Sequence, residues 1–129
     1  MDKNANIIVK IKSTNLTLLP EVEGYIRTKI QMLEKFFKHY AEEGDLLFEV
    51  EIGKTTEHHR SGDVFRAEIN FTAPGVYFRS ESLKDDLYAA IDEAKDELSR
   101  ELRKSKNKSI NLLKRGGAAL KNLLRRDTP

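Results

Sequence analysis

The stretch "TEHHRSGDVF", residues 56–65, places two of the three histidines of the chain side by side. Imidazole nitrogens bind metal ions and transfer protons, and Glu57 or His39 could complete a site with His58 and His59. Neighbouring residues on a strand point to opposite faces, so this histidine pair could share one ion only within a loop. The i, i+4 spacing of helical metal ligands is absent, and so is cysteine, which makes the pattern weak for zinc.

A second hypothesis is that His58, His59 and Arg60 form a loop that contacts a polyanion. The chain offers no clear nucleophile, oxyanion turn or glycine-rich loop around the histidines, which disfavours catalysis. We therefore expect no catalytic residue, no metal, no cofactor and no small-molecule substrate. A metal-dependent or acid-base enzyme that uses His39, His58 and His59 is kept as the alternative.

Composition indicates one ordinary domain with a basic end. The 129 residues include no cysteine, which excludes a disulfide framework and a thiol nucleophile. The net charge of +2 combines a charge of +6 over residues 105–129 with a charge of −4 over residues 1–104. A mildly acidic body with a basic tail predicts an anionic partner. No stretch reaches the roughly 20 apolar residues of a membrane span, nor is there a signal-peptide pattern, so we expect a soluble cytoplasmic protein.

Hydrophobic periodicity predicts the order β-α-β-β-β-α. Apolar residues alternate in "NIIVKIKST" and in the later segments 46–55, 62–72 and 76–82, which is typical of half-buried strands. Helical spacing runs from Pro20 to about Tyr40 and again from about residue 84 to 106, where Ser82 with Asp85 three residues later forms a helix-start signature. Because every strand has one polar face, both helices should cover the same side of the sheet. The sequence therefore predicts a two-layer α+β domain over residues 1–106, with a four-stranded sheet, and a basic amphipathic tail over 107–129.

Both predicted helices carry bases late in their course, namely Lys35 and Lys38 on the first and Arg100, Arg103 and Lys104 on the second. A helix over residues 84–106 would be about 34 Å long at 1.5 Å per residue. A strand of seven or eight residues spans only about 25 Å. We therefore expect the second helix to overhang the sheet and to leave its bases exposed to an anion.

Four segments in this order and spacing resemble the ribosome hibernation-promoting factor and ribosome-associated translation inhibitor family: "GDVFRAEINF", the Pro74-Gly75 turn, "DLYAAID" and "ELSRELRKSK". The resemblance covers residues 6–108. It implies a fold similar to a double-stranded-RNA-binding domain with an added strand. It also implies binding to ribosomal RNA and proteins of the small subunit in the decoding region, where the protein blocks mRNA and tRNA sites during dormancy or stress. No enzyme activity or cofactor is implied.

The resemblance also assigns roles to individual residues. Arg100 and Lys104 match basic positions that face ribosomal RNA, and Arg103 is a neighbour with the same chemistry. The match is looser at five further candidate RNA contacts: Lys35, Lys38, His58, His59 and Arg60. Glu97 and Glu101 depart from the family, which commonly has lysine and glutamine there. Two acids beside the bases would weaken the attraction to phosphate.

Long members of this family append a dimerisation domain, and only 25 residues follow Lys104 here, so we expect a short form that is a monomer in isolation. The tail carries an apolar stripe interrupted by Gly116-Gly117, and should be disordered or frayed until it docks. Its predicted ribosome contacts are Lys106, Lys108, Lys114, Arg115 and Lys121. The tail could instead drive binding to a membrane surface or another protein. Its pattern does not decide between promotion and prevention of ribosome pairing.

Overall fold

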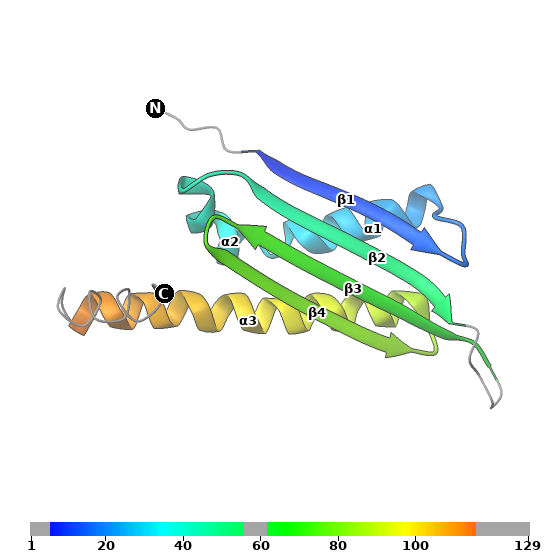
Figure 1. Ribbon diagram of the computed structural model, residues 1–129. Helices are drawn as coiled ribbons and strands as arrows, with labels where there is room; N and C mark the ends of the chain where they lie inside the picture. The colour runs from blue at the N-terminus through cyan, green and yellow to red at the C-terminus, as the bar shows by residue number, and fades with distance from the viewer. Residues whose placement is uncertain (1–5, 56–61, 116–129) are drawn as a thin grey trace.

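Apolar alternation produces four strands, and helical spacing produces a helical layer behind them (Figure 1). The computed structural model describes the backbone of residues 6–55 and 62–115 and the side chains of residues 6–55 and 62–105. The elements in chain order are β1 (Ile7–Thr14), α1 (Pro20–Gln31), α2 (Glu34–Phe37), the 3-10 helix η1 (Lys38–Glu42), β2 (Leu46–Thr55), β3 (Val64–Ala73), β4 (Val76–Lys84) and α3 (Leu87–Arg115). The predicted two-layer α+β class is confirmed.

The sheet has the strand order β1-β2-β3-β4, with β1 parallel to β2 and the other pairs antiparallel. Its inner face meets the helices and buries the residues that alternation predicted, including Phe48, Ile52 and Phe71, each 0% exposed. Gly75 closes the predicted turn between β3 and β4 with φ of 75°, a left-handed conformation that glycine adopts without strain. The opposite face has no helix over it (Figure 1), and we call it the open face.

The prediction of one helix from Pro20 to Tyr40 is wrong, because α1 ends at Gln31. The N–H of Leu33 bonds to the carbonyl of Ile30 at 2.9 Å, a tighter winding than the α-helix has. The break displaces α2 toward α3 (Figure 1). There Phe37 packs on Phe48, with ring centroids 5.2 Å apart. Helical spacing is kept on both sides of the break, so periodicity alone could not reveal it.

The second predicted helix is α3, which begins later and ends later than expected. Asp86 caps it, accepting the N–H of Ala89 at 2.9 Å. Ser82, which sequence reasoning placed at the helix start, belongs to β4 and donates to Glu93 of α3 at 2.6 Å. With 29 residues, α3 is about 43 Å long and continues past the predicted start of the tail at residue 107. Along the described residues, no helix is both long enough and apolar enough to cross a membrane.

Polar contacts fix α1 against α3. The hydroxyl of Tyr25 donates to Asp92 at 2.6 Å, and Lys29 forms an ion pair with the same carboxylate at 3.1 Å. Burial raises the pKa of Asp92, but these two hydrogen bonds outweigh it and leave the pKa below its ordinary value. The rings of Tyr25 and Tyr88 meet edge to face with centroids 4.7 Å apart. The helical layer is therefore a defined surface on which exposed side chains keep their relative positions.

Candidate nucleic-acid interface

Basic residues from two parts of the sequence meet where α2 packs on α3. The ring of Phe36 on α2 lies 5.2 Å from the Nζ of Lys35 and 6.0 Å from the guanidinium carbon of Arg103. The hydroxyls of Tyr40 in η1 and Ser105 in α3 share a hydrogen bond beside them. The ring of Phe36 thus links Lys35 of α2 to Arg103 of α3. We call the five predicted bases of the two helical segments the helix-side cluster: Lys35, Lys38, Arg100, Arg103 and Lys104.

All five bases of the helix-side cluster are exposed. Over the described residues, Lys38, Arg100 and Arg103 form no ion pair with a carboxylate. Lys104 is the exception, 3.9 Å from Glu101, and its side chain is 76% exposed. An exposed pair at this distance contributes little, so Lys104 can turn to another anion.

The reason for this exposure differs from the predicted one. Leu98 and Leu102 are fully buried beside these bases, so this part of α3 is still packed on the domain. The arginines are accessible because they lie on the outer side of the helix, opposite the buried stripe. The overhang that the sequence predicted begins farther along α3, which extends beyond the end of the sheet in Figure 1.

Other predicted contacts lie partly or wholly outside the described residues. This holds for His58, His59 and Arg60, and for Lys121. Lys106, Lys108, Lys114 and Arg115 fall on α3, whose backbone is described there without its side chains. His39 lies against Tyr40 with ring centroids 4.0 Å apart and borders a hollow of about 260 Å³ with Lys35, Lys38 and Glu42. No group of three His, Cys, Asp or Glu able to hold a metal occurs among the side chains that the structure describes.

Two acidic residues of α3, Glu93 and Glu97, contact the edge strand β4. Glu97 accepts the backbone N–H of Glu81 at 3.2 Å. Glu93 accepts the hydroxyl of Ser82 and pairs with Lys84 at 3.3 Å, and these two contacts lower its pKa. An edge strand presents N–H groups without partners, and Glu97 covers one of them. The carboxylate of Glu97 is therefore engaged with the sheet, although it lies one turn before Arg100 on α3.

The open face contains arginines of a different kind. Arg66 pairs with Glu68 and, at 2.6 Å, with Glu81, while Arg79 pairs with Glu68 at 2.9 Å. Asn70 adds a hydrogen bond to Glu68 at 3.1 Å. Burial raises the pKa of Glu68, yet the hydrogen bonds from Asn70 and Arg66 outweigh it and leave the pKa lowered. Glu68 is 8% exposed, although sequence reasoning placed it in solvent.

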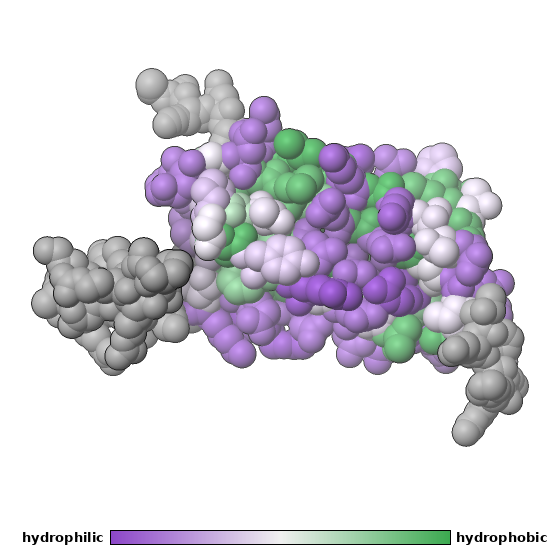
Figure 2. All heavy atoms as spheres, viewed as in Figure 1, coloured by the Kyte–Doolittle hydropathy of each residue, from purple (hydrophilic) through white to green (hydrophobic). Residues whose placement is uncertain are grey.

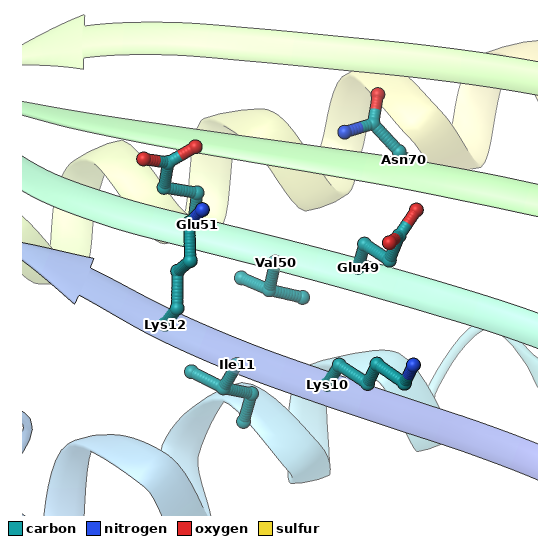
Figure 3. A pocket seen from close by; sticks show the side chains of 7 residues that line it. All are labelled: Lys10, Ile11, Lys12, Glu49, Val50, Glu51 and Asn70. Carbon is teal, nitrogen blue, oxygen red and sulfur yellow. The ribbon is translucent and has the colours of Figure 1, made fainter.

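A hollow of about 390 Å³ on the open face lies beside this network. Figure 3 shows two lysines of β1 and two glutamates of β2 around it, with the side chain of Lys12 extending toward Glu51. Hydrophilic residues cover most of this face (Figure 2). Acidic residues lie among the bases here, so the open face should attract a polyanion less than the helix-side cluster does.

A one-sided four-stranded sheet with a helical layer that carries exposed bases defines an α+β domain. The family described as "Sigma 54 modulation protein / S30EA ribosomal protein" matches residues 9–110, and the chain belongs to this family. The family resemblance seen in the sequence is thereby confirmed.

Two curated relatives carry the name ribosome hibernation promotion factor. The protein of Picosynechococcus is 28% identical over 100 residues, which cover 78% of this chain and 49% of the relative. The protein of Staphylococcus aureus is 31% identical over 99 residues, which cover 77% of this chain and 48% of the relative. The chain therefore spans about half the length of the curated relatives that it matches.

Two solved structures share the fold. The N-terminal domain of Thermus thermophilus protein Y is 26% identical with a TM-score of 0.58, over 79% of this chain and 98% of that one. A ribosomal subunit interface protein from Coxiella burnetii has a TM-score of 0.62 over 78% of this chain and 98% of that one. Its identity of 14% supports likeness of fold alone.

Proposed function

We propose that this chain is a ribosome hibernation factor that binds the small subunit in the decoding region and blocks the mRNA and tRNA sites. The observation that carries the proposal is the helix-side cluster, five exposed bases on a domain of this family. Its partners are ribosomal RNA and proteins of the small subunit, so the protein works in the cytoplasm. It acts by occupancy, as a monomer, and needs no catalytic residue.

The chemistry of the cluster suits the phosphate backbone of RNA. Arginine forms two parallel hydrogen bonds to a phosphate, whereas lysine acts as a mobile point charge. Contacts of this kind fix the position of a protein on RNA without reading bases, which is sufficient for a factor that blocks a channel. The helix α3 carries further bases that would extend the contact: Lys106, Lys108, Lys114 and Arg115. Lys121, which follows them in the sequence, would extend it further. We assign the same role to His58, His59 and Arg60.

The test compares two double variants that lose the same charge. Arg100→Ala with Lys104→Ala removes two bases from the helix-side cluster, and Lys10→Ala with Lys12→Ala removes two from the open face. Binding to purified small ribosomal subunits is measured across salt concentrations. Each phosphate contact contributes roughly 0.7–0.9 to the slope of log affinity against log salt, so the first variant should flatten it by about one to two units. The control should keep both slope and affinity.

Two outcomes would contradict this proposal. Equal losses in both variants would mean that only net charge matters, and no loss in the first would place the RNA-facing surface elsewhere. Footprinting of ribosomal RNA with the unaltered chain tests the decoding region separately. Protection confined to sites outside that region would refute the proposed mode of inhibition.

A further inference from the structure

Two consecutive phenylalanines have different surroundings. Phe37 is 2% exposed and packs on Phe48 and Phe71, with ring centroids 5.2 and 6.3 Å away. Phe36 packs at the margin of the core and is only partly buried. Its ring instead contacts two cations, Lys35 from its own helix and Arg103 from α3. The ring of Phe36 thus lies near one base of α2, Lys35, and one base of α3, Arg103.

Aromatic rings attract cations because the quadrupole of the π system makes the ring face negative. Two cations brought close together repel each other, and a shared ring offsets part of this repulsion. The ring also restricts side chains that would otherwise move among many rotamers, and so lowers the entropy lost when they bind an anion. A ring between Lys35 and Arg103 therefore prepares them for one ligand that neutralises both.

We propose that Phe36 is a positioning residue whose ring holds Lys35 and Arg103 together as one phosphate-binding unit across α2 and α3. The ligand is the phosphate backbone of a single RNA segment that contacts both helices. This inference rests on the proposed function, because it takes the helix-side cluster to be the RNA-binding surface. It adds an apolar residue, which charge alone does not identify, to the determinants of binding.

The test distinguishes the effect of the π system of Phe36 from the effect of its apolar volume. Phe36→Leu keeps an apolar side chain against the core and removes the π system, whereas Phe36→Trp keeps the π system. For small ribosomal subunits at low salt, Phe36→Leu should weaken binding by about five- to thirtyfold, the factor that two exposed cation–π contacts represent. Phe36→Trp should bind at least as well as the unaltered chain. Thermal unfolding of both variants checks that the fold is intact.

A double-mutant cycle tests the mechanism. If the ring acts through Arg103, Phe36→Leu should have a much smaller effect in the Arg103→Ala background, and the two losses should not multiply. Lys95→Ala, a base of α3 that pairs with Asp96, provides a matched background in which Phe36→Leu keeps its full effect. A merely structural role for Phe36 would give the same loss in both backgrounds.

Inorganic polyphosphate serves as a second probe, because it presents phosphates without a ribosome. If the chain does not bind small subunits, but the coupling between Phe36 and Arg103 is measured in its binding to polyphosphate, the proposed function is wrong and the positioning role stands. Suppose instead that the chain binds subunits but that, on both probes, Phe36→Leu does not change the affinity or its loss multiplies with that of Arg103→Ala. The positioning role is then wrong and the proposed function stands. Failure of Phe36→Trp to retain affinity, with the fold intact, would also overturn the positioning role.

Discussion

The open face and the helix-side cluster both carry bases, but of their arginines only those of the open face pair with carboxylates among the described residues. On the open face, Arg66 and Arg79 are each held by the carboxylates of Glu68 and Glu81. In the cluster, the guanidinium of Arg103 meets an aromatic ring, and among the described residues it meets no carboxylate. The comparison teaches that the partners of a base, more than the number of bases on a surface, decide whether that surface can bind an anion.

Geometry explains the difference. In the sheet, Glu68 lies opposite Glu81 and Asn70 lies opposite Arg79, so each arginine reaches a carboxylate on the neighbouring strand diagonally. On α3, the acid one turn before Arg100 is Asp96, and it pairs with Lys95 at 3.3 Å. Of the other acids of α3, Asp92 contacts α1, Glu93 and Glu97 contact β4, and Glu101 lies 3.9 Å from Lys104. Each acid of α3 therefore has a contact that does not involve Arg100 or Arg103.

Charge reversal should give the largest separation between the two surfaces. We expect Arg100→Glu with Lys104→Glu to weaken binding to small subunits by about a hundredfold or more. Two charge-assisted hydrogen bonds are lost at about 1.5 kcal/mol or more each, and tenfold in affinity corresponds to about 1.4 kcal/mol. The matched variant, Lys10→Glu with Lys12→Glu, should lose far less. Filter binding at fixed salt measures both, and a comparable loss in the open-face variant would end the distinction between the surfaces.

Removal of the central acid of the open face should make that face resemble the cluster. Glu68→Ala removes the carboxylate that Arg66 and Arg79 share and leaves Glu81 as the remaining acidic partner of both. The free energy of unfolding should fall by about 1.5–3 kcal/mol, the range for hydrogen bonds to charged groups. Elution from a polyphosphate column should shift to higher salt, because two arginines lose one carboxylate partner and the face loses one negative charge. Urea unfolding measures the first effect, and an unchanged stability would mean that solvent already replaces Glu68.

Alternation and helical spacing predicted most of the fold, because burial imposes a period of two or 3.6 wherever one face is covered. They could not predict the break before α2, since Leu33 and Phe37 keep helical spacing across it. The start of α3 was placed at Ser82, because a serine followed by an acid resembles a helix cap. In the structure that serine is 6% exposed on β4, where its hydroxyl contacts α3. Local signals of this kind are overridden by tertiary contacts.

The bases of the cluster could be named from residue type, but the shared contact of Lys35 and Arg103 with one aromatic ring could not. Phe36 was missed, because a phenylalanine beside Phe37 fits the core stripe equally well in sequence. Glu68 was missed for the opposite reason, since a glutamate at an outward strand position indicates solvent. Only the register of β3 against β4 places two arginines around it. Such pairing depends on strand neighbours, which one sequence does not contain.

The charge on Glu68 should make part of the stability depend on pH. Its pKa is lowered in the folded state, so its contribution is fully present above the unfolded value of about 4.3 and is lost as pH falls through the folded value. Glu68→Gln keeps an acceptor oxygen and should cost only about 1 kcal/mol at pH 7, the difference between charged and neutral hydrogen bonds. Urea unfolding from pH 7 to pH 2 should show this cost shrinking below about pH 4.3. A cost that does not change with pH would exclude the carboxylate charge as its source.

The smallest effect is expected at Glu97, which stands between the two regions. Glu97→Gln keeps an oxygen that accepts the N–H of Glu81 and removes one negative charge three residues before Arg100. Interactions at this spacing amount to about 0.2–0.5 kcal/mol, so binding to small subunits should tighten by about twofold at low salt and stability should hardly change. Glu97→Lys also removes the acceptor, so it should lower stability by about 1 kcal/mol through the exposed edge of β4. If Glu97→Lys is as stable as the unaltered chain, the carboxylate does not support the edge strand. If Glu97→Gln binds no more tightly, the negative charge of Glu97 does not weaken the binding of RNA by the helix-side cluster.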